Sequence, residues 1–105
     1  MTRVKFLFKN GSLSGYEIKG HSTNCVDDLE GKIVCSAVSS AAYMTANTII
    51  EIIGDECEII VDEAAMYLSI KTPSDKSRLV LEGFKLHITE LSKQYNNRIK
   101  IITEV

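Results

Sequence analysis

The sequence has little of what marks a disordered or membrane-spanning protein. It contains only one proline and six glycines among 105 residues, with 45% hydrophobic and 25% charged residues. That balance is typical of a globular domain and argues against a disordered chain. Its purely apolar runs are only a few residues long, whereas a bilayer requires about 20. We therefore expect a soluble globular protein with no membrane partner.

An excess of basic charge and an export signal are also lacking. Twelve Lys and Arg residues against fourteen Asp and Glu residues give a formal net charge of −2, whereas proteins that bind nucleic acid usually carry a strong basic excess. Met1–Lys9 alternates between apolar and polar residues with no small-residue cleavage site after it, so it predicts a strand and not a signal peptide. We expect a cytoplasmic protein with no direct nucleic-acid partner and three reduced cysteines.

The first part of the chain predicts a β-hairpin followed by a long loop. Arg3–Phe8 has the two-residue period of a half-buried strand, the Asn-Gly pair at 10–11 predicts a turn, and Leu13–Lys19 predicts the second strand. Gly20–Gly31 is small, polar and acidic and shows no period. Loops of this length inside compact domains are usually functional or mobile.

A long helix and a second hairpin are expected next. Ile33–Ile53 places apolar residues at spacings of three and four, the period of a helix, and Gly54 is suited to end it with a left-handed cap. Cys57–Asp62 and Met66–Lys71 are short β-rich runs that predict two paired strands.

The rest of the chain predicts one more helix and one more strand. Ser74 or Asp75 is a suitable N-cap, and the helix then carries an apolar stripe. That stripe consists of Leu81, Phe84, Ile88, Leu91 and Tyr95. A strand follows over 99–105. The order ββαββαβ, in one domain over 1–105, predicts an α+β fold with two helices on a roughly five-stranded, mostly antiparallel sheet.

Cys35 and His21 are the candidates for a nucleophile and its base. A thiol reacts as thiolate, which an ordinary pKa of about 8.5 keeps scarce at neutral pH, and a neighbouring imidazolium or a helix N-terminus lowers that pKa. Cys35 is predicted in the first turn of the long helix, and His21 begins the loop that leads to it. A lone cysteine on an apolar helix is more often a small core residue. Spacing alone therefore leaves both interpretations open.

Other chemically capable residues carry weaker signals. Cys25 lies in the loop, where no helix terminus would lower its pKa. Cys57 is at the start of a predicted strand and is expected to pack in the core. His87 is expected to be a structural or solvated histidine. His21, Cys25 and Cys35 match no recognised ligand spacing, so no metal is expected. The acidic residues Asp27, Asp28 and Glu30 are expected to be solvated, although one of their carboxylates is a candidate to orient His21.

The serines after Cys35 have two interpretations. Ser36, Ser39 and Ser40 are small and would let another element pack closely against the helix. The backbone N–H groups at Cys35 and Ser36 are candidates for an oxyanion hole, because N–H groups at a helix N-terminus stabilise developing negative charge.

Two segments together resemble a known family. Gly20-His21-Ser22, followed after a variable loop by Ile-Val-Cys-Ser-Ala-Val-Ser over 33–39, resembles the signature of the ribosomal-processing cysteine protease family Prp. The resemblance extends over nearly the whole chain, since the hairpins, helices and last strand come in that family's order. The combined pattern is much more specific than either half.

The resemblance implies a homodimeric cytoplasmic protease that needs no cofactor. It would remove the N-terminal extension of a large-subunit ribosomal protein, number twenty-seven, during ribosome assembly. His21 and Cys35 match the family's catalytic pair. The loop would be a flap that orders over the substrate peptide, and its residues include Ser22, Asn24, Asp28, Glu30 and Gly31.

One departure keeps other functions open. Family members usually carry Asp directly before Ile-Val-Cys, where this chain has Lys32. Asp28 or Glu30 is a candidate substitute for it. Ser36 in place of the commoner Ala is a milder departure. The alternatives are a non-catalytic ribosome-associated or assembly protein on the same fold, and a thiol-dependent transferase that uses the same dyad.

Overall fold

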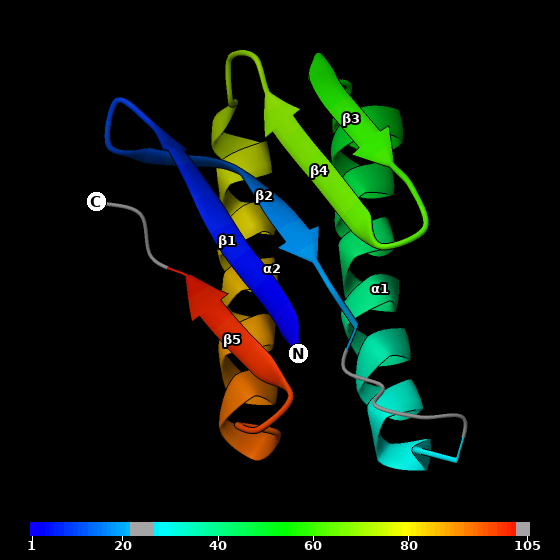
Figure 1. The fold of residues 1–105 in the computed structure, drawn as a ribbon. Coiled ribbons are helices and arrows are strands. Elements are labelled where there is room, and N and C mark those ends of the chain that lie inside the picture. The colour runs from blue at the N-terminus through cyan, green and yellow to red at the C-terminus, as the bar shows by residue number, and fades with distance from the viewer. Residues whose placement is uncertain (22–26, 103–105) are drawn as a thin grey trace.

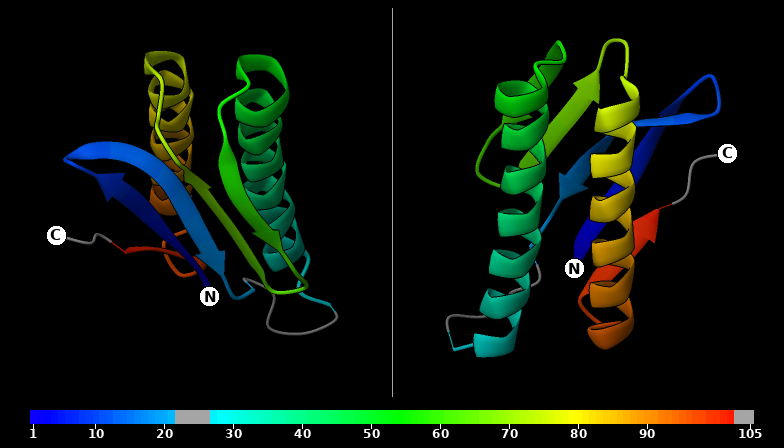
Figure 2. Two further views of the ribbon diagram at one scale, coloured as in Figure 1. Left: turned by 90° about the horizontal axis from the view of Figure 1, so that it is seen from above. Right: turned by 180° about the vertical axis from the view of Figure 1, so that it is seen from behind.

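The fold is a five-stranded sheet with two long helices on one face, seen in a computed structural model that describes residues 1–21 and 27–102. The elements follow in the order β1 Thr2–Lys9, β2 Ser12–Lys19, α1 Leu29–Asn47, η1 Thr48–Ile53, β3 Cys57–Val61, β4 Ala65–Ile70, α2 Asp75–Gln94 and β5 Ile99–Ile102. Figure 1 and the two further views in Figure 2 show both helices behind the same face of the sheet. The predicted α+β class and ββαββαβ order are confirmed.

The sheet has the strand order β3-β4-β2-β1-β5 and is mixed. The pairs β1–β2, β2–β4 and β3–β4 are antiparallel, and β1–β5 is parallel. The predicted hairpins are both present, and Asn10 and Gly11 both take positive φ values, 53° and 78°, as a tight turn between strands requires. β5 is the edge strand at one side of the sheet, and β3 is the edge strand at the other.

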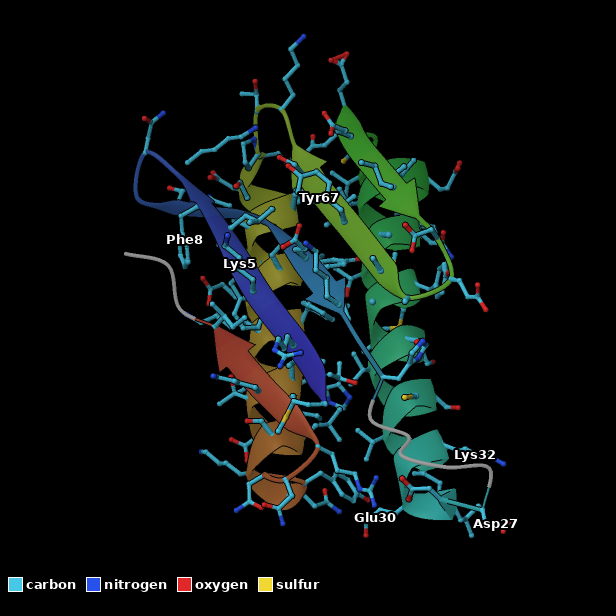
Figure 3. All side chains as sticks on the ribbon, in the orientation of Figure 1. Lys5, Phe8, Asp27, Glu30, Lys32 and Tyr67 are labelled. Carbon is cyan, nitrogen blue, oxygen red and sulfur yellow. The ribbon has the colours of Figure 1, made fainter. Side chains whose placement is uncertain are left out.

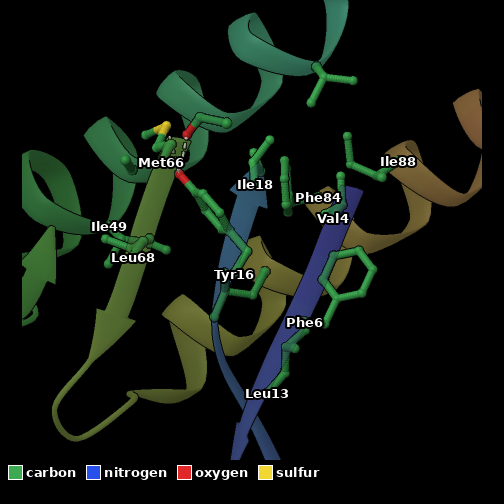
Figure 4. Close-up of a cluster of buried hydrophobic side chains, with 14 of the residues drawn as sticks. Val4, Phe6, Leu13, Tyr16, Ile18, Ile49, Met66, Leu68, Phe84 and Ile88 are labelled. Carbon is green, nitrogen blue, oxygen red and sulfur yellow. Dashed lines mark hydrogen bonds between the residues drawn. The ribbon is translucent and has the colours of Figure 1, made fainter. Parts of the chain in front are cut away.

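Apolar side chains from the inner face of the sheet and from both helices form the core (Figure 4). Tyr16 lies at its centre, with its ring 4.6 Å from that of Phe84 and its hydroxyl donating a 2.7 Å hydrogen bond to the backbone oxygen of Ala42. Burial raises the pKa of Tyr16 far above its ordinary value, so its hydroxyl remains a donor and ties β2 to α1.

Helix α1 begins four residues earlier than predicted and changes geometry near its end. Asp28 is its N-cap and accepts a hydrogen bond from the Gly31 backbone N–H at 3.1 Å. Its continuation, η1, is a π-helical turn in which the Gly54 N–H reaches the Ile49 oxygen at 2.9 Å. Gly54 has φ 86° and ends the helix as predicted. By length and composition Leu29–Ile53 could cross a membrane, but its buried face packs on the sheet.

Helix α2 begins as predicted, with Ser74 as N-cap. The Ser74 hydroxyl accepts from the Ser77 N–H at 3.2 Å, and it donates to the Asp55 carboxylate at 2.7 Å. The predicted apolar stripe faces the core, since Leu81, Phe84 and Ile88 are buried. β5 follows one turn later, where the Thr2 N–H donates to the Arg98 oxygen at 2.8 Å.

Candidate active site

A pocket of about 160 Å³ lies where the end of β2, the middle of α1 and the β3–β4 turn meet. His21 and Cys35, which are separated by the loop and the start of the helix, both line it. The turn between β3 and β4 lies alongside α1 in Figure 1 and forms the wall opposite the helix. The fold therefore brings the two predicted catalytic residues to one cavity.

One face of α1 supplies the floor of the pocket. Cys35, Val38, Ser39 and Ala42 recur at spacings of three and four, so their side chains share one side of the helix. Val38 and Ala42 are buried, Cys35 is half-buried and Ser39 is exposed. The thiol thus lies at the boundary between core and solvent, where a substrate can reach it. The helical spacing from Cys35 was the available signal for Ser39 and for the next lining residue, Tyr43, which the sequence analysis did not assign to the site.

The backbone on either side of His21 is fixed by neighbouring segments. The Gly20 N–H donates to the Ala64 oxygen at 3.0 Å, and the amino group of Met1 donates to the His21 oxygen at 2.5 Å. Gly20 has φ +85°, and a Cβ there would lie 2.5 Å from the Met1 oxygen. Only glycine fits this approach. The His21 side chain is exposed at the rim of the pocket.

The β3–β4 turn brings acidic residues to the pocket. Asp62 and Glu63 line it with Ala64, and the Asp62 carboxylate accepts the Ala64 N–H at 3.1 Å. The sequence predicted Asp62 as the end of a strand and Glu63 and Ala64 as part of the connection after it, and it pointed to none of them as a site residue. Their proximity to His21 comes from the pairing of β2 with β4, which no local pattern indicates.

Cys35 and Ser36 do not lie in the first turn of α1, although the predicted oxyanion hole at these residues assumes that they do. Because α1 begins at Leu29, both residues lie in its second turn, where helical N–H groups donate to carbonyls four residues back. The N–H groups that such a hole would use belong to the first turn, and there Gly31 donates to the Asp28 side chain and Lys32 to the Asp28 oxygen.

The predicted flap is shorter than expected, because three of its residues belong to the helix or its cap. Asp28 caps α1, Glu30 lies in its first turn, and Gly31 is buried within it. Asp28 and Glu30 form ion pairs with Arg98, at 2.5 and 2.9 Å. These two carboxylates therefore connect the start of α1 to the residue before β5, and a role of either toward His21 stays a prediction. Ser22 and Asn24 lie outside the described residues.

The remaining candidates lie away from the pocket or outside the described residues. Lys32 is exposed and extends from α1 into solvent (Figure 3), so it does not line the cavity. His87 is exposed on α2. Burial and the Asp55 carboxylate raise the pKa of Cys57, which makes it a poor nucleophile. Cys25 is outside the described residues, and among the residues described no three His, Cys, Asp or Glu side chains converge on a metal site.

A sequence model of the family described as cysteine protease Prp matches residues 1–100 of the chain. A comparison with curated protein sequences finds no match.

Several solved structures have the same fold over nearly the whole chain. The S. aureus ribosomal processing protease Prp, in complex with a covalently linked product peptide, has a TM-score of 0.82 and 20% identity, and the match covers 99% of this chain and 100% of that one. The S. aureus protease in complex with a substrate peptide has a TM-score of 0.85 and 18% identity, and the match covers 99% of this chain and 100% of that one. SMU.848 of Streptococcus mutans has a TM-score of 0.84 and 25% identity, and the match covers 99% of this chain and 96% of that one. The pocket is therefore set in a fold that these proteins share.

Proposed function

The chain belongs to the cysteine protease Prp family, and from this premise we propose that Cys35 is its nucleophile and His21 its general base. The observation that carries the proposal is that both residues line one pocket although the chain separates them by a loop and two helical turns. Cys35 is half-buried on the floor and His21 is exposed at the rim, so an extended peptide entering the pocket meets both.

The proposed reaction has two steps. His21 takes the proton of the Cys35 thiol, and the sulfur attacks the carbonyl carbon of the peptide. The C–N bond then breaks, the amine leaves with the proton from His21, and a thioester remains on Cys35. A water molecule, deprotonated by His21, attacks the thioester and releases the acid and the thiol. No cofactor takes part.

We propose that the substrate is the N-terminal extension of the large-subunit ribosomal protein numbered twenty-seven. The resemblance in residues 20–22 and 33–39 supports this substrate. The pocket also suits an apolar side chain, since Ile18, Val38 and Met66 contribute to its lining. The proposal includes a cytoplasmic location, a homodimeric state, and no direct contact with nucleic acid.

The test is mass spectrometry of an N-terminally extended substrate protein incubated with the wild type and with three variants. Cys35→Ala and His21→Ala should abolish cleavage at the single site, and Cys57→Ala, whose thiol lies outside the pocket, should retain it. Cleavage by Cys35→Ala would overturn the assignment of the nucleophile.

Two other outcomes would point to the alternative functions. A wild-type protein that binds the extended substrate without cleaving it would indicate a non-catalytic ribosome-associated or assembly protein. An acyl group that persists on Cys35 and passes to an acceptor other than water would indicate a transferase.

A further inference from the structure

Strand β3 leaves one edge of its backbone directed away from the sheet. It is the terminal strand in the order β3-β4-β2-β1-β5. The Lys71 N–H donates to the Glu56 oxygen at 3.0 Å and the Asp62 N–H to the Ala65 oxygen at 2.9 Å, so the even-numbered residues of this segment bond to β4. Along an antiparallel strand, the backbone N–H and C=O groups of successive residues point to opposite sides. The backbone groups of Cys57, Ile59 and Val61 therefore point away from the sheet.

The side chains of this edge are apolar and exposed. Ile59, Ile60 and Val61 have exposed fractions of 42%, 51% and 48%. Ile59 and Val61 lie opposite Leu68 and Met66, so they extend the core face of the sheet, and Ile60 lies opposite Tyr67 on the outer face. An edge strand with apolar side chains on both faces and an outward row of backbone groups is a template for one more strand.

The edge is also strongly acidic. The segment from 54 to 70 contains no lysine or arginine and has five acidic residues in and around β3, namely Asp55, Glu56, Glu58, Asp62 and Glu63. The next residue, Lys71, forms an exposed ion pair with Glu56 at 3.2 Å, and the region keeps a net negative charge. A second copy paired antiparallel about Ile59 would place Glu56 opposite Asp62, and like charges facing each other across strands are destabilising. The charge therefore disfavours pairing between two copies and favours a basic segment.

The edge leads into the candidate active site. Val61, the last residue of β3, and the turn residues Asp62 and Glu63 line the pocket that holds Cys35 and His21. In Figure 1 the β3 arrow points toward this turn, which lies beside α1. A peptide added along β3 would cover the strand's five residues and continue into the cavity.

We propose that β3 is a docking strand that binds a lysine- or arginine-rich extended segment of the substrate, next to the scissile bond, as a sixth strand of the sheet. This inference rests on the proposed protease function, since the scissile bond is taken to lie at Cys35. Backbone pairing along β3 supplies the binding without regard to sequence, and the carboxylates select basic side chains.

Cleavage of three synthetic peptides tests the charge preference. The three peptides have the same residues around the cleaved bond and differ only in a flanking stretch. In that stretch Thr alternates with Lys in the first peptide, with Gln in the second and with Glu in the third. We expect kcat/KM to be at least tenfold higher for the Lys peptide than for the Glu peptide. The value for the Lys peptide should fall as the salt concentration rises, because salt screens the attraction between charges. Glu58→Lys should reduce this ratio severalfold. The matched control Glu82→Lys, an exposed residue on α2 away from the pocket, should leave it unchanged.

Binding to the Cys35→Ala protein tests strand pairing without relying on activity. Two versions of the Lys peptide carry N-methyl groups on alternate residues, one on the odd positions and the other on the even positions. Only one of these two sets of N–H groups faces β3 in a paired strand. Methylation of that set should weaken binding by at least tenfold, and methylation of the other set should not. Ile59→Pro removes an outward N–H without removing a bond to β4 and should weaken binding of the unmethylated peptide, whereas Ile59→Val should not.

The outcomes separate this inference from the proposed function. Cleavage of all three peptides at equal rates would overturn the docking strand and leave the protease intact. Phase-dependent binding of the Lys peptide without any cleavage would support the docking strand and overturn the protease. Variants of β3 that alter only the oligomeric state would identify the edge as an interface between copies and overturn the inference.

Discussion

At the scale of single residues, the two thiols that the structure describes have opposite surroundings. Cys35 lines a pocket together with a histidine, and Cys57 lies at the start of β3 beside Asp55. A neighbouring imidazolium favours thiolate, whereas burial and a neighbouring carboxylate oppose it. We therefore expect the thiol of Cys35 to be the more reactive of the two.

This difference predicts selective alkylation. At pH 6.5 iodoacetamide should modify Cys35 at least ten times faster than Cys57, because the pKa of Cys57 is raised above that of an ordinary thiol. Peptide mapping by mass spectrometry gives both rates in one sample. His21→Ala should slow Cys35 without changing Cys57, and equal rates at both thiols in the wild type would contradict the proposed dyad.

Gly15 shows how tightly a single position is packed. A Cβ at Gly15 would lie 1.9 Å from the Leu68 backbone oxygen, so Gly15→Ala should force β2 and β4 apart and lower the free energy of unfolding by about 1–3 kcal/mol. Gly83→Ala is the matched control: its Cβ meets nothing within 4 Å, and the change should stabilise α2 by about 0.5–1 kcal/mol. Urea denaturation measures both, and an unchanged midpoint for Gly15→Ala would contradict this packing.

At the scale of elements, Asp55 connects the segment before β3 to the start of α2. It accepts hydrogen bonds from the Ser74 N–H at 3.0 Å and the Ser74 hydroxyl at 2.7 Å. The Ser77 and Ser74 side chains and the Ser74 N–H lower the pKa of Asp55. A carboxylate whose pKa is lowered by folding stabilises the native state above its unfolded pKa.

This linkage has a defined pH dependence. The stabilisation should be complete above about pH 5 and should be lost as the pH falls below about 4, toward the lowered pKa of Asp55 in the folded protein. Asp55→Asn should unfold at a lower temperature at pH 7 and should differ less from the wild type at pH 3. Thermal denaturation at both pH values measures the difference, and a gap that widens at pH 3 would contradict the sign.

Most elements could be predicted from local patterns, and the start of α1 could not. Alternation identified the first and last strands, and β-rich composition identified β3 and β4. Asn10-Gly11 marked the turn of the first hairpin, and Gly54 marked the end of the first helix. The helix start was missed because residues 29–32 contain an exposed Leu, a Gly and two charges, which hide the apolar period. Asp28, three residues before Gly31, was the available capping signal.

At the scale of the whole molecule, contacts between distant segments decide the site. Arg98 holds Asp28 and Glu30, which lie 70 and 68 residues earlier in the chain. The parallel β1–β5 pair places Arg98 at the base of α1, and no local pattern indicates either contact. This distance explains why the sequence could indicate Cys35 and His21 by resemblance but could not predict which contacts fix the start of the helix that contains Cys35.

Arg98→Ala should therefore weaken the active site from outside it. The N-terminal turn of α1 should lose order, because the half-buried Arg98 side chain is the ion-pair partner of both Asp28 and Glu30 there. Hydrogen exchange should rise at residues 29–32 and kcat/KM should fall. Lys93→Ala, which breaks an exposed pair with Glu90 on α2, is the control. Unchanged exchange at 29–32 would contradict this role of Arg98.

The Arg98 ion pairs also bear on when a newly made molecule becomes active. During synthesis Cys35 and His21 leave the ribosome long before Arg98 and β5 do. A nascent chain that still lacks Arg98 and β5 therefore has neither the ion pairs at the first turn of α1 nor the parallel strand that pairs with β1. The protease should therefore acquire its activity only after β5 has been added to the sheet.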